Sequence, residues 1–312
     1  MKCKKVFILF LLCIISTFCF AQEQVFLIPF GYDFIRLGEQ NVHSPAVGFG
    51  FLSGEQDLPF IQVERRFFGL ALYHPFFFKE EPKWGVAKQL HQIDAIFDGR
   101  IKRHQLLFIF KSAADKPIAG GLNTFQAGAG WGYELIRQDH VSLILGVALG
   151  VSDFGFTPVL PLPLVRFGID TQWFVSSFDF LTGPNFSFTI APKERIRFTG
   201  DMRMDKYRNI SDLIYEFIIW YRLFNNEHKL GDFAGIGFGI KNDIVDFNVS
   251  NDSTAKVFEF QQTSIFASIE LSILTIQGGW IFDSNYIVND EKTQSLGKGF
   301  FVSVQGIIPI KK

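Results

Sequence analysis

The sequence predicts an all-β fold: a single antiparallel transmembrane β-barrel of about 12 strands, within a range of about 10 to 14, behind an N-terminal signal peptide. Three observations predict this class. The chain begins with charged and then apolar residues, it contains no later apolar run of helical length, and many segments place apolar side chains at every second position. We therefore divide the chain into a signal peptide at 1–21 and one barrel at 22–312.

The N-terminus follows the three-part pattern of a secretory signal. Three lysines lie within the first five residues, residues 6–20 are mainly apolar, and the small residues Cys19 and Ala21 precede an expected cut before Gln22. The apolar stretch of about 15 residues is shorter than the roughly 20 that a spanning helix needs. This length favours cleavage over a retained anchor, so we expect an exported chain.

All three cysteines, Cys3, Cys13 and Cys19, belong to the expected signal. Neither Cys13 nor Cys19 follows a small residue, as a lipid-attachment cysteine normally does, so we expect no lipidation. The mature chain then carries no disulfide, no thiol nucleophile and no thiolate metal site.

The composition favours a membrane protein that crosses with strands. The chain has 39 Phe residues and 48% hydrophobic residues, and its net charge of −1 gives no reason to expect nucleic acid. After the signal, no run approaches the length of a membrane helix. Since only helices and closed barrels satisfy their backbone groups inside lipid, we expect a barrel in an outer membrane. Its partners would be outer-membrane lipid and the barrel-assembly machinery.

Two neighbouring segments show the alternation most clearly. Within 122–137 and 141–152, large apolar residues occupy one face and small or polar residues occupy the other. A soluble sandwich would turn the large residues inward, whereas a barrel turns them toward lipid. Several segments exceed the 5–6 residues usual in soluble sheets and approach the 9–11 of membrane strands. Length therefore favours the barrel, with small side chains leaving space inside it.

Further strands are expected in segments whose polar faces keep charges well inside the strand, which is typical of a polar interior. The candidate lumen-lining charges are Arg166, Asp170, Arg195, Arg197, Asp201, Arg203, Glu216 and Arg222. One interpretation is a constriction that selects solutes by charge. The other, which we favour, is a salt-bridged interior that braces a closed barrel.

Weaker segments complete the predicted barrel. They lie at 46–54, 60–73, 90–98, 103–111, 186–191, 229–241, 275–283 and 300–308. We expect long polar loops at 54–59, 79–88, 248–256 and 285–298. The proline-rich segment 158–163 is predicted to be a rigid loop or a short plug, because proline cannot donate a ladder hydrogen bond.

Residues 150–198 carry a resemblance. The residues concerned are Ser152-Asp153-Phe154-Gly155, Pro158, Pro161 and Pro163, then Phe180, Pro184 and Pro192. This pattern resembles the uncharacterised outer-membrane β-barrel protein families of diderm bacteria. The resemblance implies a barrel in the outer membrane and supplies no catalytic residue. In one respect the chain departs from such proteins, which commonly end in an aromatic residue, because it ends Ile310-Lys311-Lys312.

No motif predicts a cofactor, a metal site or a catalytic group. The glycine runs at 128–132 and 235–239 look superficially like phosphate-binding loops, but they lie inside alternating strands. We expect them to keep one face small or to permit curvature. The six histidines are scattered, with no ligand spacing.

The best functional hypothesis is a passive pore or small-solute channel without a cofactor. One alternative is a structural or surface-exposed barrel whose loops bind a partner. The other is a lipid-modifying outer-membrane enzyme, in which His104 or His140 would activate a neighbouring serine. We expect a protein that is not an enzyme.

Overall fold

The computed structural model describes residues 24–38, 40–54, 65–78, 89–115, 125–151, 159–180, 184–204, 213–223, 234–251, 254–271, 273–288 and 291–311. The predicted signal peptide at 1–21, the loop at 79–88 and most of the loop at 54–59 lie outside these residues. Within the described part there is no helix long and apolar enough to cross a membrane.

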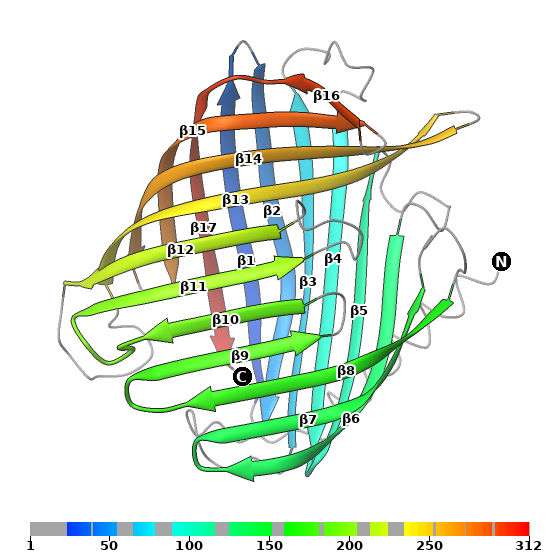
Figure 1. Ribbon diagram of the computed structural model, residues 1–312, viewed down its shortest axis with the longest axis vertical. Helices are drawn as coiled ribbons and strands as arrows, with labels where there is room; N and C mark the ends of the chain where they lie inside the picture. Colours follow the sequence, from blue (N-terminus) through cyan, green and yellow to red (C-terminus); the bar gives the residue numbers. More distant parts are fainter. Residues whose placement is uncertain are drawn as a thin grey trace.

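The described residues form strands joined by turns (Figure 1). In chain order the strands are β1 Gln24–Leu37, β2 Gln40–Gly54, β3 Arg65–Phe78, β4 Gln89–Ile101, β5 His104–Ala114, β6 Phe125–Gln138, β7 Val141–Val151, β8 Val159–Asp170, β9 Phe174–Phe180, β10 Pro184–Ile190, β11 Ile196–Met204, β12 Leu213–Arg222, β13 Ala234–Asn251, β14 Thr254–Leu271, β15 Leu274–Val288, β16 Glu291–Ser295 and β17 Gly299–Lys311.

Antiparallel pairing closes these strands into one barrel. From β1 to β15 each strand pairs with the next in the chain, and β17 pairs with both β15 and β1. The short β16 also pairs with β15, so β16 and β17 together form one interrupted barrel strand. The predicted antiparallel barrel is confirmed, but the count of about 12 is wrong: within the described residues the barrel has 16 strands.

Two strands account for much of the undercount. β1 carries large apolar residues on both faces, including Phe26 and Leu27, so it shows little alternation. Its inner face packs among other apolar side chains, with Leu37 almost fully buried. β9 is only seven residues long and was not separated from the preceding segment.

The proline-rich segment is the clearest local error, because β8 runs straight through Pro161 and Pro163. Both prolines pair with β7, while pairing with β9 begins only at Val165. Successive N–H groups of a strand point to alternate sides, so prolines two residues apart have their nitrogens on the same side. The strand has one neighbour here, and both nitrogens can point to the side without a partner, the edge position in which proline is tolerated.

Two predicted loops are also strands in part. β13 and β14 remain paired through the predicted loop at 248–256, and β15 and β16 occupy much of 285–298. The polar side chains of these segments resemble loop composition, but ladder hydrogen bonds come from the backbone and do not require apolar residues. Near its end β13 also pairs in parallel with β5, through Asn248 and Ala114.

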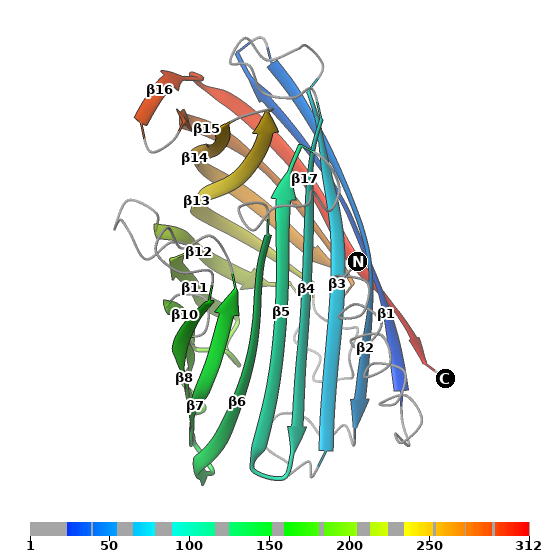
Figure 2. The same ribbon diagram turned by 90° about the vertical axis from the view of Figure 1, so that its right-hand side faces the viewer.

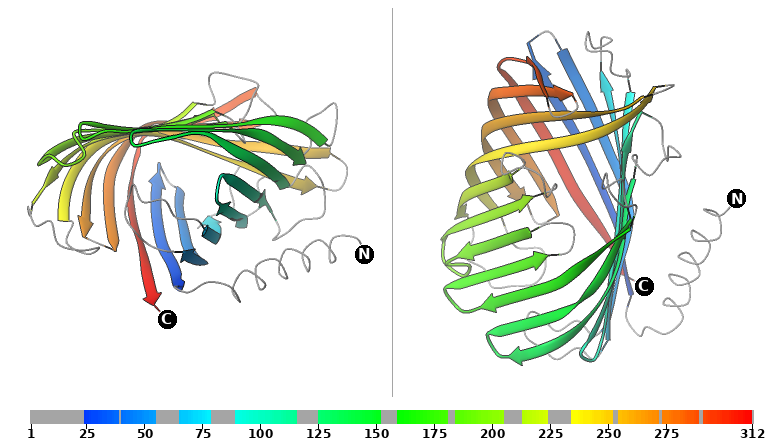
Figure 3. Two further views of the ribbon diagram at one scale, coloured as in Figure 1. Left: turned by 90° about the horizontal axis from the view of Figure 1, so that it is seen from below. Right: turned by 45° about the vertical axis from the view of Figure 1, so that its right-hand side comes forward.

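The barrel has an apolar outer face and a mixed inner face. Outward side chains include Val147 and Phe238, each 66% exposed. Figure 1 shows β8 to β14 crossing in front of β1 to β5, and Figures 2 and 3 show the two walls from the side and from below. The inner faces of these walls hold the candidate functional residues.

Candidate functional site on the inner wall

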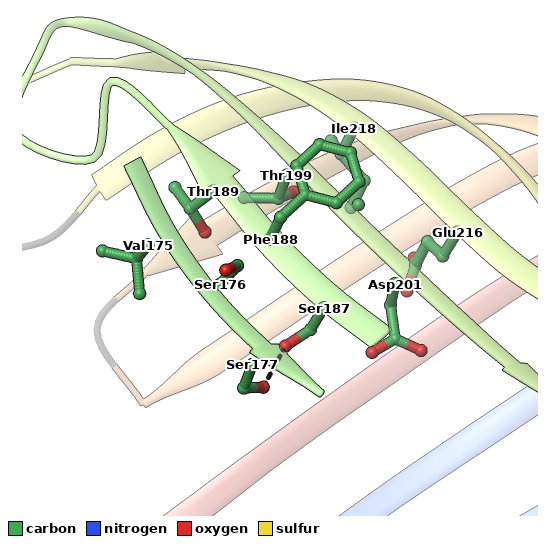
Figure 4. Close-up of a pocket in the computed structure, with 11 residues that line it drawn as sticks. Val175, Ser176, Ser177, Ser187, Phe188, Thr189, Thr199, Asp201, Glu216 and Ile218 are labelled. Atoms are coloured by element: carbon green, nitrogen blue, oxygen red, sulfur yellow. Dashed lines mark hydrogen bonds between the residues drawn. The ribbon is translucent and has the colours of Figure 1, made fainter. Parts of the chain in front are cut away.

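A hollow of about 250 Å³ lies on the inner wall of β9 to β12. Eight of its eleven lining residues form two neighbouring cross-strand rows, and the other three, Ser176, Phe188 and Gly200, lie between these rows (Figure 4). One row runs Ser177, Ser187, Asp201, Glu216, and the other runs Val175, Thr189, Thr199, Ile218. Four hydroxyl groups and two carboxylates therefore lie on a single wall. This combination suits a water-filled surface that hydrogen-bonds to polar solutes.

The hydroxyl and carboxylate row of the hollow has few internal bonds. Ser177 Oγ and Ser187 Oγ lie 2.7 Å apart and share a hydrogen bond. Asp201 and Glu216 are direct cross-strand partners, and Gln277 Nε2 donates to Glu216 Oε1 at 3.4 Å. Like charges directly opposite each other destabilise a sheet, so this pair is held together by the surrounding fold and not by mutual attraction.

An ion-paired cluster spans the inner face from β4 to β9. Arg166 on β8 donates to Asp98 on β4 at 2.6 Å through Nη1 and to Asp179 on β9 through Nε. Gln105 Nε2 on β5 also donates to Asp98, at 2.7 Å. Since β5, β6 and β7 lie between β4 and β8 in the sheet, the wall must bend sharply for these groups to meet.

Small residues on β6 and β7 make room for this bend. A Cβ added to Gly130 would lie 2.8 Å from Leu164, and one on Gly132 would lie 2.7 Å from Ile144. Leu164, Ile144 and Leu107 form a buried apolar cluster on the inner face. The space predicted beside the small residues is therefore filled by these side chains, while the predicted role of the glycines in keeping one face small is confirmed.

A second filled region lies around β13. Arg197 Nη2 on β11 donates to Glu270 Oε2 on β14 at 3.0 Å, passing over the glycines of β13. The Arg197 guanidinium also lies over the Trp220 ring. The inner apolar cluster here consists of Leu37, Ile218, Trp220, Phe266, Ile281 and Phe301.

Lys241 lies beside this cluster, with its Nζ 4.4 Å from the centre of the Phe301 ring and 3.1 Å from Asp243 Oδ2.

The remaining candidate charges lie nearer the ends of their strands. Asp170 ends β8, and its backbone carbonyl accepts a hydrogen bond from His140 Nδ1 at 2.7 Å. Arg195 is exposed, with its guanidinium over the Tyr221 ring. Arg203 is exposed on β11. Arg222 donates to the carbonyl of Pro192 at 3.2 Å and weakly to that of Lys193.

Several partners of these charges were absent from the predicted set. Asp98, Asp179, Lys241 and Glu270 each contact or neighbour a candidate residue. Asp98 and Lys241 carry the available signal, a charge well inside a strand, whereas Asp179 and Glu270 are the penultimate residues of β9 and β14. Sequence alone could not show which charges pair, because Asp98 and Arg166 are 68 residues apart.

The two histidines of the enzyme hypothesis have other neighbours. His104 faces outward and packs against the rings of Trp131 and Tyr133. His140 contacts the carbonyl of Asp170. Within the described residues, no group of three or more His, Cys, Asp or Glu is arranged to hold a metal ion.

No protein-family model matches the chain, and no curated protein is similar to it in sequence. Among solved structures it is similar to OccAB3 from Acinetobacter baumannii, with a TM-score of 0.41 and 10% identity over 92% of this chain and 99% of the other. It is also similar to OpdQ from Pseudomonas aeruginosa, with a TM-score of 0.39 and 12% identity over 92% and 99%. A BenF-like porin from Pseudomonas fluorescens Pf-5 gives 0.39 and 8% over 93% and 98%. At these identities the likeness concerns the arrangement of strands and carries over no residue.

Proposed function

We propose that this chain is exported by a signal peptide at 1–21 and forms an outer-membrane β-barrel that acts as a passive pore for small solutes. The observation that carries the proposal is the hydroxyl- and carboxylate-lined hollow on the inner wall of a closed barrel whose outer face is apolar. In this proposal outer-membrane lipid surrounds the barrel, the barrel-assembly machinery inserts it, and small solutes pass along the inner wall.

The outer face supports a lipid environment. Exposed large apolar side chains recur on strands around the barrel, including Val47, Val147, Phe238 and Ile265. A patch of this extent is unusual on a soluble monomer, because it places much apolar surface in water. Apart from strand ends and the stretch of β8 before Val165, the described strands are paired on both sides around the closed barrel, as residence in a bilayer requires.

A second candidate function is a braced barrel that conducts nothing and presents its loops to a partner. The two inner apolar clusters and the ion pairs of Arg166 and Arg197 favour it, because they occupy part of the interior. The two candidates differ in one respect: the pore requires the hollow of β9 to β12 to open to both sides of the membrane.

The test begins with the chain lacking residues 1–21, refolded in detergent. A band that migrates faster unboiled than boiled would establish a compact closed barrel. The refolded protein is then placed in liposomes, and swelling is followed in isotonic neutral sugars of increasing size.

Swelling that falls steeply with sugar size is the expected result for a pore. Folded protein that gives no swelling with the smallest sugar would select the braced barrel. An unboiled band identical to the boiled one, from protein that stays soluble without detergent, would overturn the membrane assignment itself.

A further inference from the structure

Three inner-facing arginines of the barrel wall have nearby partners. Arg166 contacts Asp98 and Asp179, Arg197 contacts Glu270, and Arg222 donates to backbone carbonyls. Each guanidinium is therefore drawn toward the protein and away from a passing solute. The charges of Arg166 and Arg197 contribute little to the field over the hollow, because a guanidinium paired with a carboxylate acts at a distance mainly as a dipole. Arg222 keeps its net charge, since backbone carbonyls are neutral, but it ends β12, six residues along the strand from Glu216.

Two carboxylates in the hollow differ from these cations. Asp201 and Glu216 lie directly opposite each other in mid-strand positions of β11 and β12, and both line the hollow (Figure 4). Glu216 accepts its bond from the neutral amide of Gln277. Neither carboxylate has an ion pair within 4 Å among the described residues.

The nearest cations offset this charge only in part. Arg203 lies two residues from Asp201 on the same strand and is exposed. Lys241 is the cross-strand partner of Glu216, but its ammonium lies 3.1 Å from Asp243 Oδ2 and over the Phe301 ring. Three carboxylates on this part of the wall therefore face two cations, which leaves an excess of negative charge beside the hollow.

Resting on the proposed pore function, we propose that Asp201 and Glu216 make the pore cation-selective, so that its favoured solutes are small cations, including hydroxyl-bearing organic cations. Carboxylates lining a narrow passage attract cations and repel anions. The hydroxyl groups of Ser187, Thr189 and Thr199 beside them supply hydrogen bonds to the hydroxyls of such a solute.

The size of the effect follows from Coulomb's law. At about 10 Å in water, one unpaired charge changes the local concentration of a monovalent ion about twofold, raising it for cations and lowering it for anions. Each carboxylate is thus expected to change the potassium-to-chloride permeability ratio about fourfold at low salt, and less at high salt because of screening.

The test is the reversal potential of single barrels in planar bilayers under a potassium chloride gradient at low ionic strength, repeated with glucosamine hydrochloride in place of potassium chloride. The wild-type potential is expected to have the sign of a cation-selective pore with both salts. Asp201→Asn and Glu216→Gln are each expected to lower the cation preference about fourfold, and Glu216→Asp is expected to keep it.

Asp139→Asn is the matched control, because it removes one negative charge from the exposed β6–β7 turn, which contributes no residue to the lining of the hollow. A conducting wild type without cation preference would overturn the inference and leave the pore intact. So would a cation preference that neither amide variant lowers, or one that the control lowers equally. A folded wild type that shows no current at all would instead overturn the proposed pore function, on which the inference rests.

Discussion

Two parts of the inner wall differ in the side chains that they place in the barrel interior. Around β4 to β8 the wall bends over glycines, and its interior is filled by Leu107, Ile144 and Leu164 beneath the Arg166 ion pairs. Along β9 to β12 the wall carries hydroxyls and two unpaired carboxylates around a hollow. The difference indicates that stability is concentrated in the filled region, which leaves the polar wall free to contact solutes.

The largest effect is expected from Arg166→Ala in the filled region. The change leaves Asp98 and Asp179 partly buried without their counter-charge, and breaking such a pair costs about 3–5 kcal/mol. Urea unfolding in lipid vesicles, followed by the gel shift, measures the loss. Arg195→Ala is the matched control, since this exposed guanidinium only overlies the Tyr221 ring and should cost about 1 kcal/mol or less. Equal losses in the two variants would show that the cluster does not brace the wall.

A smaller loss, about 2–5 kcal/mol, is expected from Leu164→Ala, because it opens a cavity at a side chain that is 1% exposed. Leu145→Ala on the adjacent strand faces outward, where lipid can fill the space, and should cost clearly less. The same unfolding assay compares them. A larger loss at Leu145 than at Leu164 would reverse our assignment of inner and outer faces.

The alternating segments at 125–137 and 141–151 could be predicted because each has one face of large apolar residues and one of small or polar residues. That pattern fails where the barrel fills its own interior. β1 places apolar residues inside as well as outside, and β8 places Leu160, Leu162 and Leu164 inward between outward prolines. Alternation therefore disappears at the filled regions, and the predicted number of strands is lower than the observed number.

For the candidate charges, the sequence predicts the face of the strand but not the partner. Charges such as Arg166, Arg197, Asp201 and Glu216 could be assigned to the polar face of their strands from alternation alone. Which of them pair depends on how the wall curves, because Arg197 and Glu270 meet across two intervening strands. Curvature comes from contacts between distant strands, so the sequence could not separate braced charges from free ones.

Two glycine substitutions test how tightly the β13 region is packed. A Cβ on Gly237 would lie 2.8 Å from Ile218 and from the Trp220 ring, so Gly237→Ala should cost about 1–3 kcal/mol through overpacking. At Gly278 the nearest atom would be 3.9 Å away. Gly278→Ala should therefore be neutral or stabilise by up to about 1 kcal/mol. Urea midpoints measure both, and a neutral Gly237→Ala would show that the β13 region is not tightly filled.

The smallest effect is expected on the polar wall. Ser187→Ala removes the hydrogen bond to Ser177, which is exposed to solvent, and should cost about 1 kcal/mol or less. Unfolding in urea is again the measurement. A loss as large as that of Leu164→Ala would mean that the hollow is part of the packed interior and not a surface for solutes.

The central claim is that the wall of β9 to β12 meets water while the outer face meets lipid, and single cysteines test it most directly. The chain lacking residues 1–21 contains no native cysteine, so Ser187→Cys and Val147→Cys each introduce a unique thiol. Each variant is placed in a bilayer and treated with a charged, membrane-impermeant thiol reagent. We predict that the cysteine at 187 reacts and reduces the single-channel current, while the cysteine at 147 stays unmodified. A reactive thiol at 147 together with an unreactive one at 187 would contradict the account.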